Sequence, residues 1–169
     1  MSVKLKLKII CLLILFSNCK NKTASNLSLS NNIPPNKSQA IVVDKANLFS
    51  KIQNDSLTLK IMAYEKETTN EIGLLTIDSL TSGENIQYFG TQVANTWGIG
   101  KREKNNGLLI TMSKYDKKIS ISTGLGTEKT ISDYECKVII DNIMVPNFQN
   151  GSYYEGVIKA LDSLFMLWD

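Results

Sequence analysis

Four residues in the second half of the chain carry the oxygen atoms that hard cations prefer. Asn105 and Asn106 stand just before an apolar run with the length of a strand, and Glu128 and Asp133 follow a glycine-rich turn. Carboxylate and amide oxygens are the usual ligands of Ca²⁺ and Mg²⁺ in proteins. If the fold brings the two segments together, these four residues would form a site for one of these ions.

Each of these acids also has an ordinary structural explanation. Asp133 stands in the first turn of an expected helix, where the helix dipole favours a negative charge. Glu128 could be a solvated loop residue beside a lysine. Asp44 and Asp78 form a second candidate cluster, because they should fall together at the opposite end of the sheet, although Asp44 could equally be a loop or cap residue.

A glycine-rich segment, "NTWGIGKREKNNGLLI" at residues 95–110, raises the question of a phosphate-binding loop. A dinucleotide fingerprint follows a strand and opens a helix, so that the phosphates meet free N–H groups. Here the glycines follow a helical pattern, and Glu103 stands where the third glycine should be. The sequence therefore predicts a helix C-cap and a surface loop. The basic run 101–104 is expected to be solvated, although it could hold a phosphoryl oxygen.

The chain contains no histidine, which limits the chemistry available to it. Ser-His and Cys-His catalysis and His-ligated zinc are excluded. Cys136 shares a helical stripe with isoleucines, so we expect a small core residue rather than a nucleophile. A catalytic nucleophile is therefore unassigned, and the sequence leaves open whether the protein is an enzyme.

The first residues have the layout of an export signal. Lysines precede an apolar run from Ile9 to Phe16, which is too short to span a bilayer. The run ends at "LFSNC", which resembles a bacterial lipobox, and Cys19 would then be lipidated after removal of residues 1–18. Ordinary cleavage near Cys19 and an uncleaved anchor are the alternatives. With Lys20 in second place, we expect a lipoprotein on the periplasmic side of the cell envelope, with the outer membrane favoured.

Removal of the signal would also change the charge of the protein. The signal carries three lysines and no acid, so the formal charge of +3 would fall to zero. The mature chain would then lack the excess positive charge with which proteins bind nucleic acids, so we expect no nucleic-acid partner. Residues 19–39 are rich in Asn, Ser and Lys, which predicts a flexible tether, and residues 40–169 have the size of one domain.

Hydrophobic periodicity places the elements that would position these residues. A helix between two apolar strands predicts a parallel βαβ unit, and an alternating strand after a polar turn predicts an antiparallel hairpin partner. We therefore expect an α/β fold, a three-layer α/β/α sandwich with a short mixed sheet. The expected elements are helix 52–67, strand 71–78, helix 85–97, strand 107–113, strand 119–124, a helix from 132 that Pro146 ends, and a last helix over 154–165.

Four landmarks now resemble the TPM domain family, which includes thylakoid-lumen phosphatases and a receptor-modulating animal branch. They are "VVDKANLFS", "WGIGKREKNNGLLI", "ISISTGLGTEKTISD" and "VPNFQNGSYYEGV", and they extend over residues 41 to 164. The resemblance implies an α/β/α domain that is often exported and attached to a membrane. It also implies that some members bind divalent cations, some are weak acid phosphatases, and many help membrane complexes to assemble.

These observations favour a binding, assembly or maintenance module for a membrane complex, with Ca²⁺ or Mg²⁺ as a possible ligand. The expected partners are the lipid bilayer, through Cys19, and an unidentified membrane protein complex, and we expect a monomeric domain. The alternative is a weak metal-dependent acid phosphatase, which would need a cation clamp, a nucleophile and a proton-transfer group.

Overall fold

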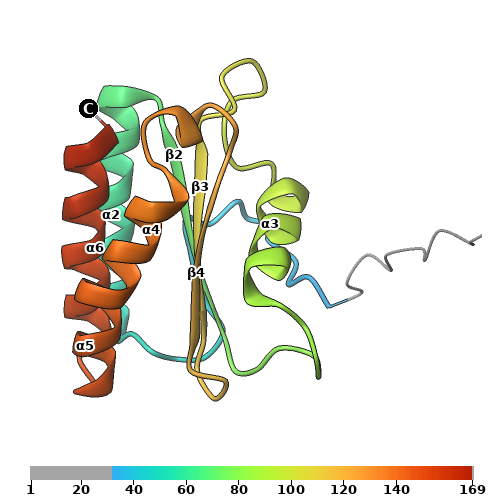
Figure 1. The fold of residues 1–169 in the computed structure, drawn as a ribbon, viewed down its shortest axis with the longest axis vertical. Helices are drawn as coiled ribbons and strands as arrows, with labels where there is room; N and C mark the ends of the chain where they lie inside the picture. Colours follow the sequence, from blue (N-terminus) through green and yellow to red (C-terminus); the bar gives the residue numbers. More distant parts are fainter. Residues whose placement is uncertain (1–31, 169) are drawn as a thin grey trace, which may run out of the picture.

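A four-stranded mixed sheet lies between helices on its two faces in the computed structural model, which describes residues 32–168 (Figure 1). Strands β1 (Val42–Asp44), β2 (Glu71–Ile77) and β3 (Gly107–Ser113) run parallel, and β4 (Lys118–Thr123) pairs antiparallel with β3. The α/β sandwich with a parallel core and a hairpin strand is confirmed. The expected signal peptide, Cys19 and the tether up to residue 31 lie outside the described residues.

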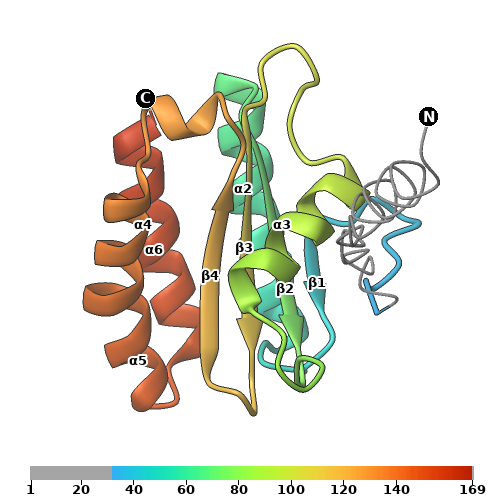
Figure 2. The ribbon, with the colours of Figure 1, turned by 45° about the vertical axis from the view of Figure 1, so that its right-hand side comes forward.

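Helices cover both faces of this sheet. One face carries α2 (Lys51–Thr68), α4 (Asp133–Ile139), α5 (Val145–Gln149) and α6 (Tyr153–Trp168), and the other carries α3 (Ile86–Trp97) (Figure 2). β2 is buried on both faces, because Ile72 and Leu74 join the larger core under α2 and α6, while Leu75 and Ile77 join the smaller core under α3. This explains why β2 and β3 have nearly continuous apolar sequences.

The helix starts follow from the sequence. The predicted capping boxes are present, with Ser50 and Gln53 closing the start of α2 and Ser132 and Glu135 closing the start of α4. In each box the hydroxyl and the longer side chain satisfy backbone N–H groups that have no helical partner.

The prediction that Pro146 ends the helix after residue 132 is wrong. A π-helical turn, η2 (Ile140–Met144), follows α4, and α5 continues from it with Pro146 in its first turn. Pro146 has no N–H to donate, and the π-helical turn before it, in which the N–H of Val145 donates to the carbonyl of Ile140, lets the helix pass this missing bond. The helical path therefore runs on to Gln149, with an extra residue per turn absorbed ahead of the proline.

Two features at the start of the domain were not predicted. β1 is only three residues long, too short for a periodicity argument, and it adds a strand beside β2 with Val42 opposite Leu74. The last residues of the expected tether also contact the domain. The indole Nε1 of Trp97 donates to the carbonyl of Pro34 at 2.8 Å, and Asn32 Nδ2 donates to Thr81 Oγ1 at 2.9 Å.

Within residues 32–168, none of the helices combines the length and the apolar character that crossing a membrane requires.

Candidate functional site

The two ends of the sheet differ in chemistry. We call the end where β1, β2 and β3 begin the amino edge, and the end where they finish the carboxyl edge. Because β4 is antiparallel, its end returns to the amino edge, where Gly124 N donates to the carbonyl of Gly107 at 2.8 Å. The segments with Asn105 and Glu128 therefore meet at the amino edge, as predicted.

Asn106 is committed to protein contacts at this edge. Its side chain is buried, its Oδ1 accepts from the backbone N–H of Lys101 at 2.9 Å, and its Nδ2 donates to the carbonyl of Thr69 and to Asn70 Oδ1. These three bonds tie the loop after α3 to the loop after α2. The structure thus gives Asn106 a positioning role in the fold.

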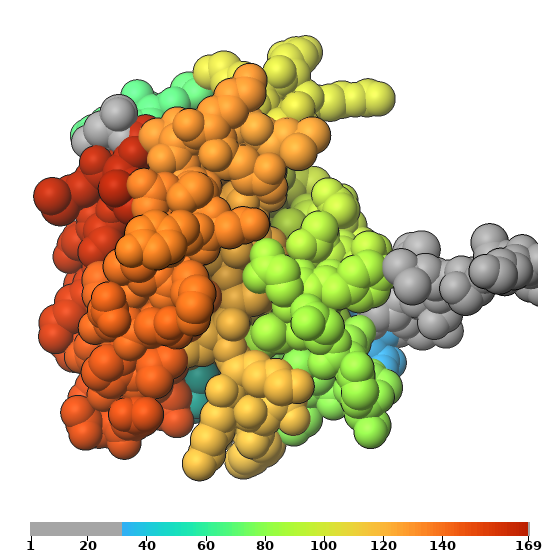
Figure 3. Space-filling view, in the orientation of Figure 1, coloured from blue at the N-terminus to red at the C-terminus, as the bar shows by residue number. Residues whose placement is uncertain are grey.

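The other three predicted ligands are exposed. Asn105 has a φ of 49°, and its backbone carbonyl accepts from Gly126 N at 3.0 Å. Glu128 lies in the short 3-10 turn η1 (Thr127–Lys129). Asp133 lines a hollow of about 380 Å³ between α3 and α4, which Figure 3 shows from the front. In the described part of the chain, no three His, Cys, Asp or Glu side chains are grouped so as to hold a metal ion.

The glycine-rich loop after α3 is held by a residue that the sequence analysis did not single out. Gly98 has a φ of 70° and caps α3, so the predicted helix C-cap is confirmed. Glu71, the first residue of β2, then accepts from the backbone N–H of Gly100 at 2.7 Å and from the ammonium of Lys101. The hydrogen bond to Glu71 raises the pKa of Lys101. The glycine-rich loop therefore binds a carboxylate of the protein itself, through the N–H of Gly100.

A second acid, Glu65, lies beside Glu71 at the amino edge. Its carboxylate accepts from the backbone N–H of Ile72 at 2.9 Å. Burial raises the pKa of Glu65, the hydrogen bond from Ile72 opposes that shift, and the charge of Glu71 adds to it. In the sequence, the only signal for the contacts of Glu71 is its position just before an apolar strand. This signal is weak, because the loop that Glu71 binds comes from a distant part of the sequence.

Asp44 is the last residue of β1 and Asp78 follows β2, so both lie at the carboxyl edge. The two oxygens of Asp44 accept from the backbone N–H groups of Leu48 and Phe49 at 3.0 and 2.9 Å, and the hydroxyl of Thr76 also donates to it. Asp44 thus closes the turn that leads into α2. Asp78 is exposed, and its backbone carbonyl accepts from the N–H of Tyr115 at 2.9 Å.

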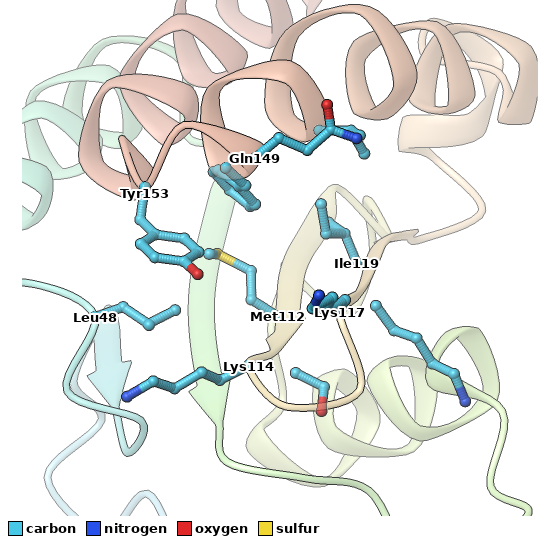
Figure 4. A pocket seen from close by; sticks show the side chains of 12 residues that line it. Leu48, Met112, Lys114, Lys117, Ile119, Gln149 and Tyr153 are labelled. Atoms are coloured by element: carbon cyan, nitrogen blue, oxygen red, sulfur yellow. The ribbon is translucent and has the colours of Figure 1, made fainter.

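A cavity of about 500 Å³ opens at the carboxyl edge, between the β3–β4 hairpin and the start of α6 (Figure 4). We call it the lysine cavity. Figure 4 shows Tyr153 and Gln149 on its helical side and Lys114 and Lys117 on the hairpin side. Its lining is Leu48, Met112, Ser113, Lys114, Lys117, Lys118, Ile119, Val145, Phe148, Gln149, Gly151 and Tyr153. This lining combines three ammonium groups with apolar walls.

Asp116, the acid of the same hairpin, does not line this cavity. Its Oδ2 accepts from the backbone N–H of Leu80 at 2.7 Å and from the hydroxyl of Ser113 at 2.5 Å, and these two bonds lower its pKa. The carboxylate is therefore fixed toward the loop after β2. The sequence did not predict this cavity. The polar turn "KYDKK", residues 114–118, shows only that three lysines lie close together in the chain.

Cys136 is a core residue, as predicted. Its side chain is buried against the larger core, and burial raises the pKa of its thiol to about 11. Because the thiolate is the nucleophilic form, this cysteine is not suited to covalent catalysis.

Comparisons with known proteins match this fold. A family model described as "TPM domain" matches residues 42–167. A search of curated proteins finds no significant match. The N-terminal domain of a P. gingivalis protein, solved by NMR, is 27% identical with a TM-score of 0.70, over 77% of this chain and 82% of that one.

Two further solved structures share the fold at lower identity. The N-terminal domain of the cg2496 protein from Corynebacterium glutamicum is 13% identical with a TM-score of 0.61, over 80% of this chain and 84% of that one. The protein BA42 from the psychrophilic bacterium Bizionia argentinensis is 20% identical with a TM-score of 0.60, over 72% and 86%. Identities in this range establish the architecture only.

The close packing at the amino edge predicts that a methyl group at Gly107 destabilises the fold. A Cβ at this position would lie 2.2 Å from the carbonyl oxygen of Ile99, so the glycine loop must shift. We expect Gly107→Ala to lower the free energy of unfolding by about 1–3 kcal/mol, as overpacking does. Urea unfolding measures this. Gly83→Asn is the control, because Gly83 has open space around it and Asn tolerates its φ of 81°. Equal stability of Gly107→Ala and wild type would contradict the packing.

The hydrogen bonds at the carboxyl edge predict that Asp44 stabilises the fold and that Asp78 does not. Asp44→Asn replaces an accepting oxygen by a donor that faces a backbone N–H, and should cost about 1–3 kcal/mol of unfolding free energy. Asp78→Asn changes an exposed side chain and should stay within about 0.5 kcal/mol. Urea unfolding in the presence of chelator tests both. A loss of the same size in the two variants would show that Asp44 has no special role in the turn.

Proposed function

The chain belongs to the TPM domain family, and from this premise we propose that it is a binding and assembly module for a membrane protein complex. In this proposal Cys19 carries a lipid, and the domain stands on the periplasmic side of a bacterial envelope, at the outer membrane. Contact with the partner, rather than turnover of a substrate, is its task.

The observation that carries the proposal is the outer face of α2. Its inner face packs Leu57 and Ile61 into the core, as expected of a surface helix. Its outer face nevertheless exposes Ile52, Leu59 and Met62, at 82%, 66% and 51% of their surface. Surface helices usually place polar residues there. We call these three residues the α2 stripe.

The spacing of the α2 stripe supports a contact surface. Positions 52, 59 and 62 fall within one side of a helix, since seven residues make nearly two turns and ten make nearly three. Exposed apolar groups that cluster in this way are typical of protein interaction sites. Leu57 and Ile61 of α2 pack in one core with residues of α6, and Lys60 pairs with Asp162 across the two helices at 2.5 Å, so the α2 stripe is presented on a packed helix pair.

The short chain between Cys19 and Asn32 supports a domain that works close to a membrane. Thirteen residue steps separate the two positions. A random coil of that length spans roughly 20 Å. The domain would then meet only partners that are themselves at the membrane.

One observation favours the alternative, a weak metal-dependent acid phosphatase. The lysine cavity holds three ammonium groups that could clamp a phosphoryl oxygen, at the same edge as Asp44 and Asp78. That reaction also needs a nucleophile and a group that moves a proton near neutral pH. With no histidine in the chain and Cys136 buried, the binding role is better supported.

Lipidation of Cys19 is the first test of this proposal. Cells that express the chain should incorporate a palmitate analogue into it, and Cys19→Ala should abolish the label. Intact mass of the purified chain measures the same modification. Label that persists in Cys19→Ala would contradict the anchor.

The α2 stripe gives the test of partner binding. Envelope crosslinking followed by mass spectrometry should capture a membrane protein with the wild-type chain, and Leu59→Glu should lower its recovery at least tenfold, because a charge in an apolar contact is desolvated without a partner. Thr91→Glu, at an exposed position of α3, is the matched control and should leave recovery unchanged.

A phosphatase assay on the same preparation tests the alternative, a weak metal-dependent acid phosphatase. With an aryl phosphate and Ca²⁺, Mg²⁺ or Mn²⁺, we expect turnover well below about 1 s⁻¹, the low end of ordinary enzymes. Faster turnover that is lost either in Asp78→Asn at the carboxyl edge or in Glu128→Gln at the amino edge, with the fold intact, would overturn the binding role.

A divalent cation at Asn105, Asn106, Glu128 and Asp133 stays a prediction. If Ca²⁺ binds the folded chain there, a concentration a hundredfold above its Kd should raise the melting temperature by on the order of 10 °C, and Glu128→Gln should remove that rise. Thermal unfolding with chelator and with millimolar CaCl₂ measures it. A wild-type melt that calcium leaves unchanged removes the metal from the proposal.

A further inference from the structure

The lysine cavity has the chemistry of a site for an anionic amphiphile. Lys117 and Lys118 are exposed at its rim, and Lys114 is half-buried, with its ammonium donating to the carbonyl of Ala46 at 3.1 Å. Leu48, Met112, Ile119, Val145 and Phe148 supply apolar walls. A ligand that combines a negative head with an apolar part would satisfy both.

No acid of the described chain neutralises this rim from within the cavity. Asp116 is the acid closest in sequence, and its carboxylate is bound to Ser113 and to the N–H of Leu80. Asp44, on the neighbouring strand end, is bound to the backbone of the turn before α2. The charge of Lys118 helps to lower the pKa of Asp116, so that acid balances part of the rim, and the exposed Lys117 keeps a positive charge that attracts anions.

The path of the chain brings the expected membrane anchor to the edge of the sheet at which this cavity opens, although on the face that α3 covers. Asn32, where the described chain begins, is held by Thr81 in the loop that follows β2. That loop lies at the carboxyl edge (Figure 1), and the lysine cavity opens at the same edge beside α5 and α6 (Figure 4). A lipid on Cys19 would thus hold the carboxyl edge within roughly 20 Å of the bilayer surface.

We propose that the lysine cavity binds the headgroup of an anionic phospholipid in the membrane that carries the Cys19 lipid. The phosphate lies against Lys117 and Lys118, and the glycerol and upper acyl carbons lie among the apolar walls. The inference rests on the proposed anchoring. Together the anchor and the headgroup contact fix the orientation of the domain and leave the α2 stripe free to meet a protein partner.

An acidic peptide is the other occupant that this chemistry allows. The lipid is favoured because the anchor brings an anionic surface to the same edge, and because two contacts through one short linker reinforce each other. Each lysine close to an anionic surface strengthens binding roughly fivefold, so two lysines would contribute about 25-fold.

The test uses the purified lipidated chain in nanodiscs of phosphatidylcholine alone or with increasing phosphatidylglycerol. Hydrogen exchange measures protection of the backbone amides of residues 113–118 and 148–153. We expect protection that depends on phosphatidylglycerol. The double variant Lys117→Gln, Lys118→Gln should raise the half-maximal phosphatidylglycerol fraction about 25-fold, beyond the accessible range. Lys114 is left unchanged because its ammonium also supports the backbone at Ala46.

The matched control removes the same charge at the opposite edge. Lys66→Gln with Lys129→Gln changes two exposed lysines and should leave the protection as in wild type. Protection that is equal with and without phosphatidylglycerol, or that survives the cavity variant, overturns the inference. Inorganic phosphate that protects the same amides equally well would assign the site to a free anion and also overturn it.

Two measurements separate this inference from the proposed function. Intact mass is determined first, and a chain without lipid on Cys19 overturns the anchor and the inference together. A lipidated chain that gains no protection from phosphatidylglycerol overturns the inference alone. In cells, a photoreactive benzoylphenylalanine at Gln149, on the cavity rim, should form a lipid adduct, and a protein adduct instead would contradict the lipid as occupant.

Discussion

The parallel pairing of β2 with β3 is the constraint on which the rest of this structure depends. The two strands stay in register over seven residues, from Glu71 opposite Gly107 to Ile77 opposite Ser113. Both faces of the pair are buried, so a slip of one residue would turn every side chain toward the wrong core. This register sets which loops meet at each edge, and so it decides which polar residues become neighbours.

The two edges use polar groups for different purposes. At the amino edge, Glu71 and Asn106 satisfy backbone groups of loops that would otherwise be free, and the raised pKa of Glu65 reflects the burial of this cluster. Buried polar groups of this kind must be paired to be tolerated. At the carboxyl edge, Asp44 and Asp116 are also paired internally, whereas Lys117 and Lys118 are exposed at the rim of the lysine cavity and leave a positive surface open to a ligand.

The positions of the groups with shifted pKa bear on the choice between the proposed binding role and catalysis. An active site concentrates groups whose proton affinity is shifted toward neutral pH and which face a shared cavity. Here the groups with resolved pKa shifts lie outside the lysine cavity: Cys136 is in the core, Asp116 is bound in its hairpin, and Glu65 and Lys101 line a separate cavity of about 350 Å³ at the amino edge. What faces outward is an apolar stripe on α2 and a basic rim. Both features suit attachment to other molecules.

The sequence by itself determined the elements and their order, because helix periodicity, capping boxes and apolar runs are local. Ser50 with Gln53 marked α2, and the runs at β2 and β3 predicted their parallel pairing. Local rules were wrong at Pro146, where a preceding π-helical turn allows the helix to continue. Only the tertiary structure decided that Asn106 and Glu71 hold loops and that three lysines surround one cavity. The partners of these hydrogen bonds and the walls of the cavity come from segments that are distant in the sequence. Whether a polar side chain binds an ion or a loop of the protein depends on which groups the folded sheet places next to it.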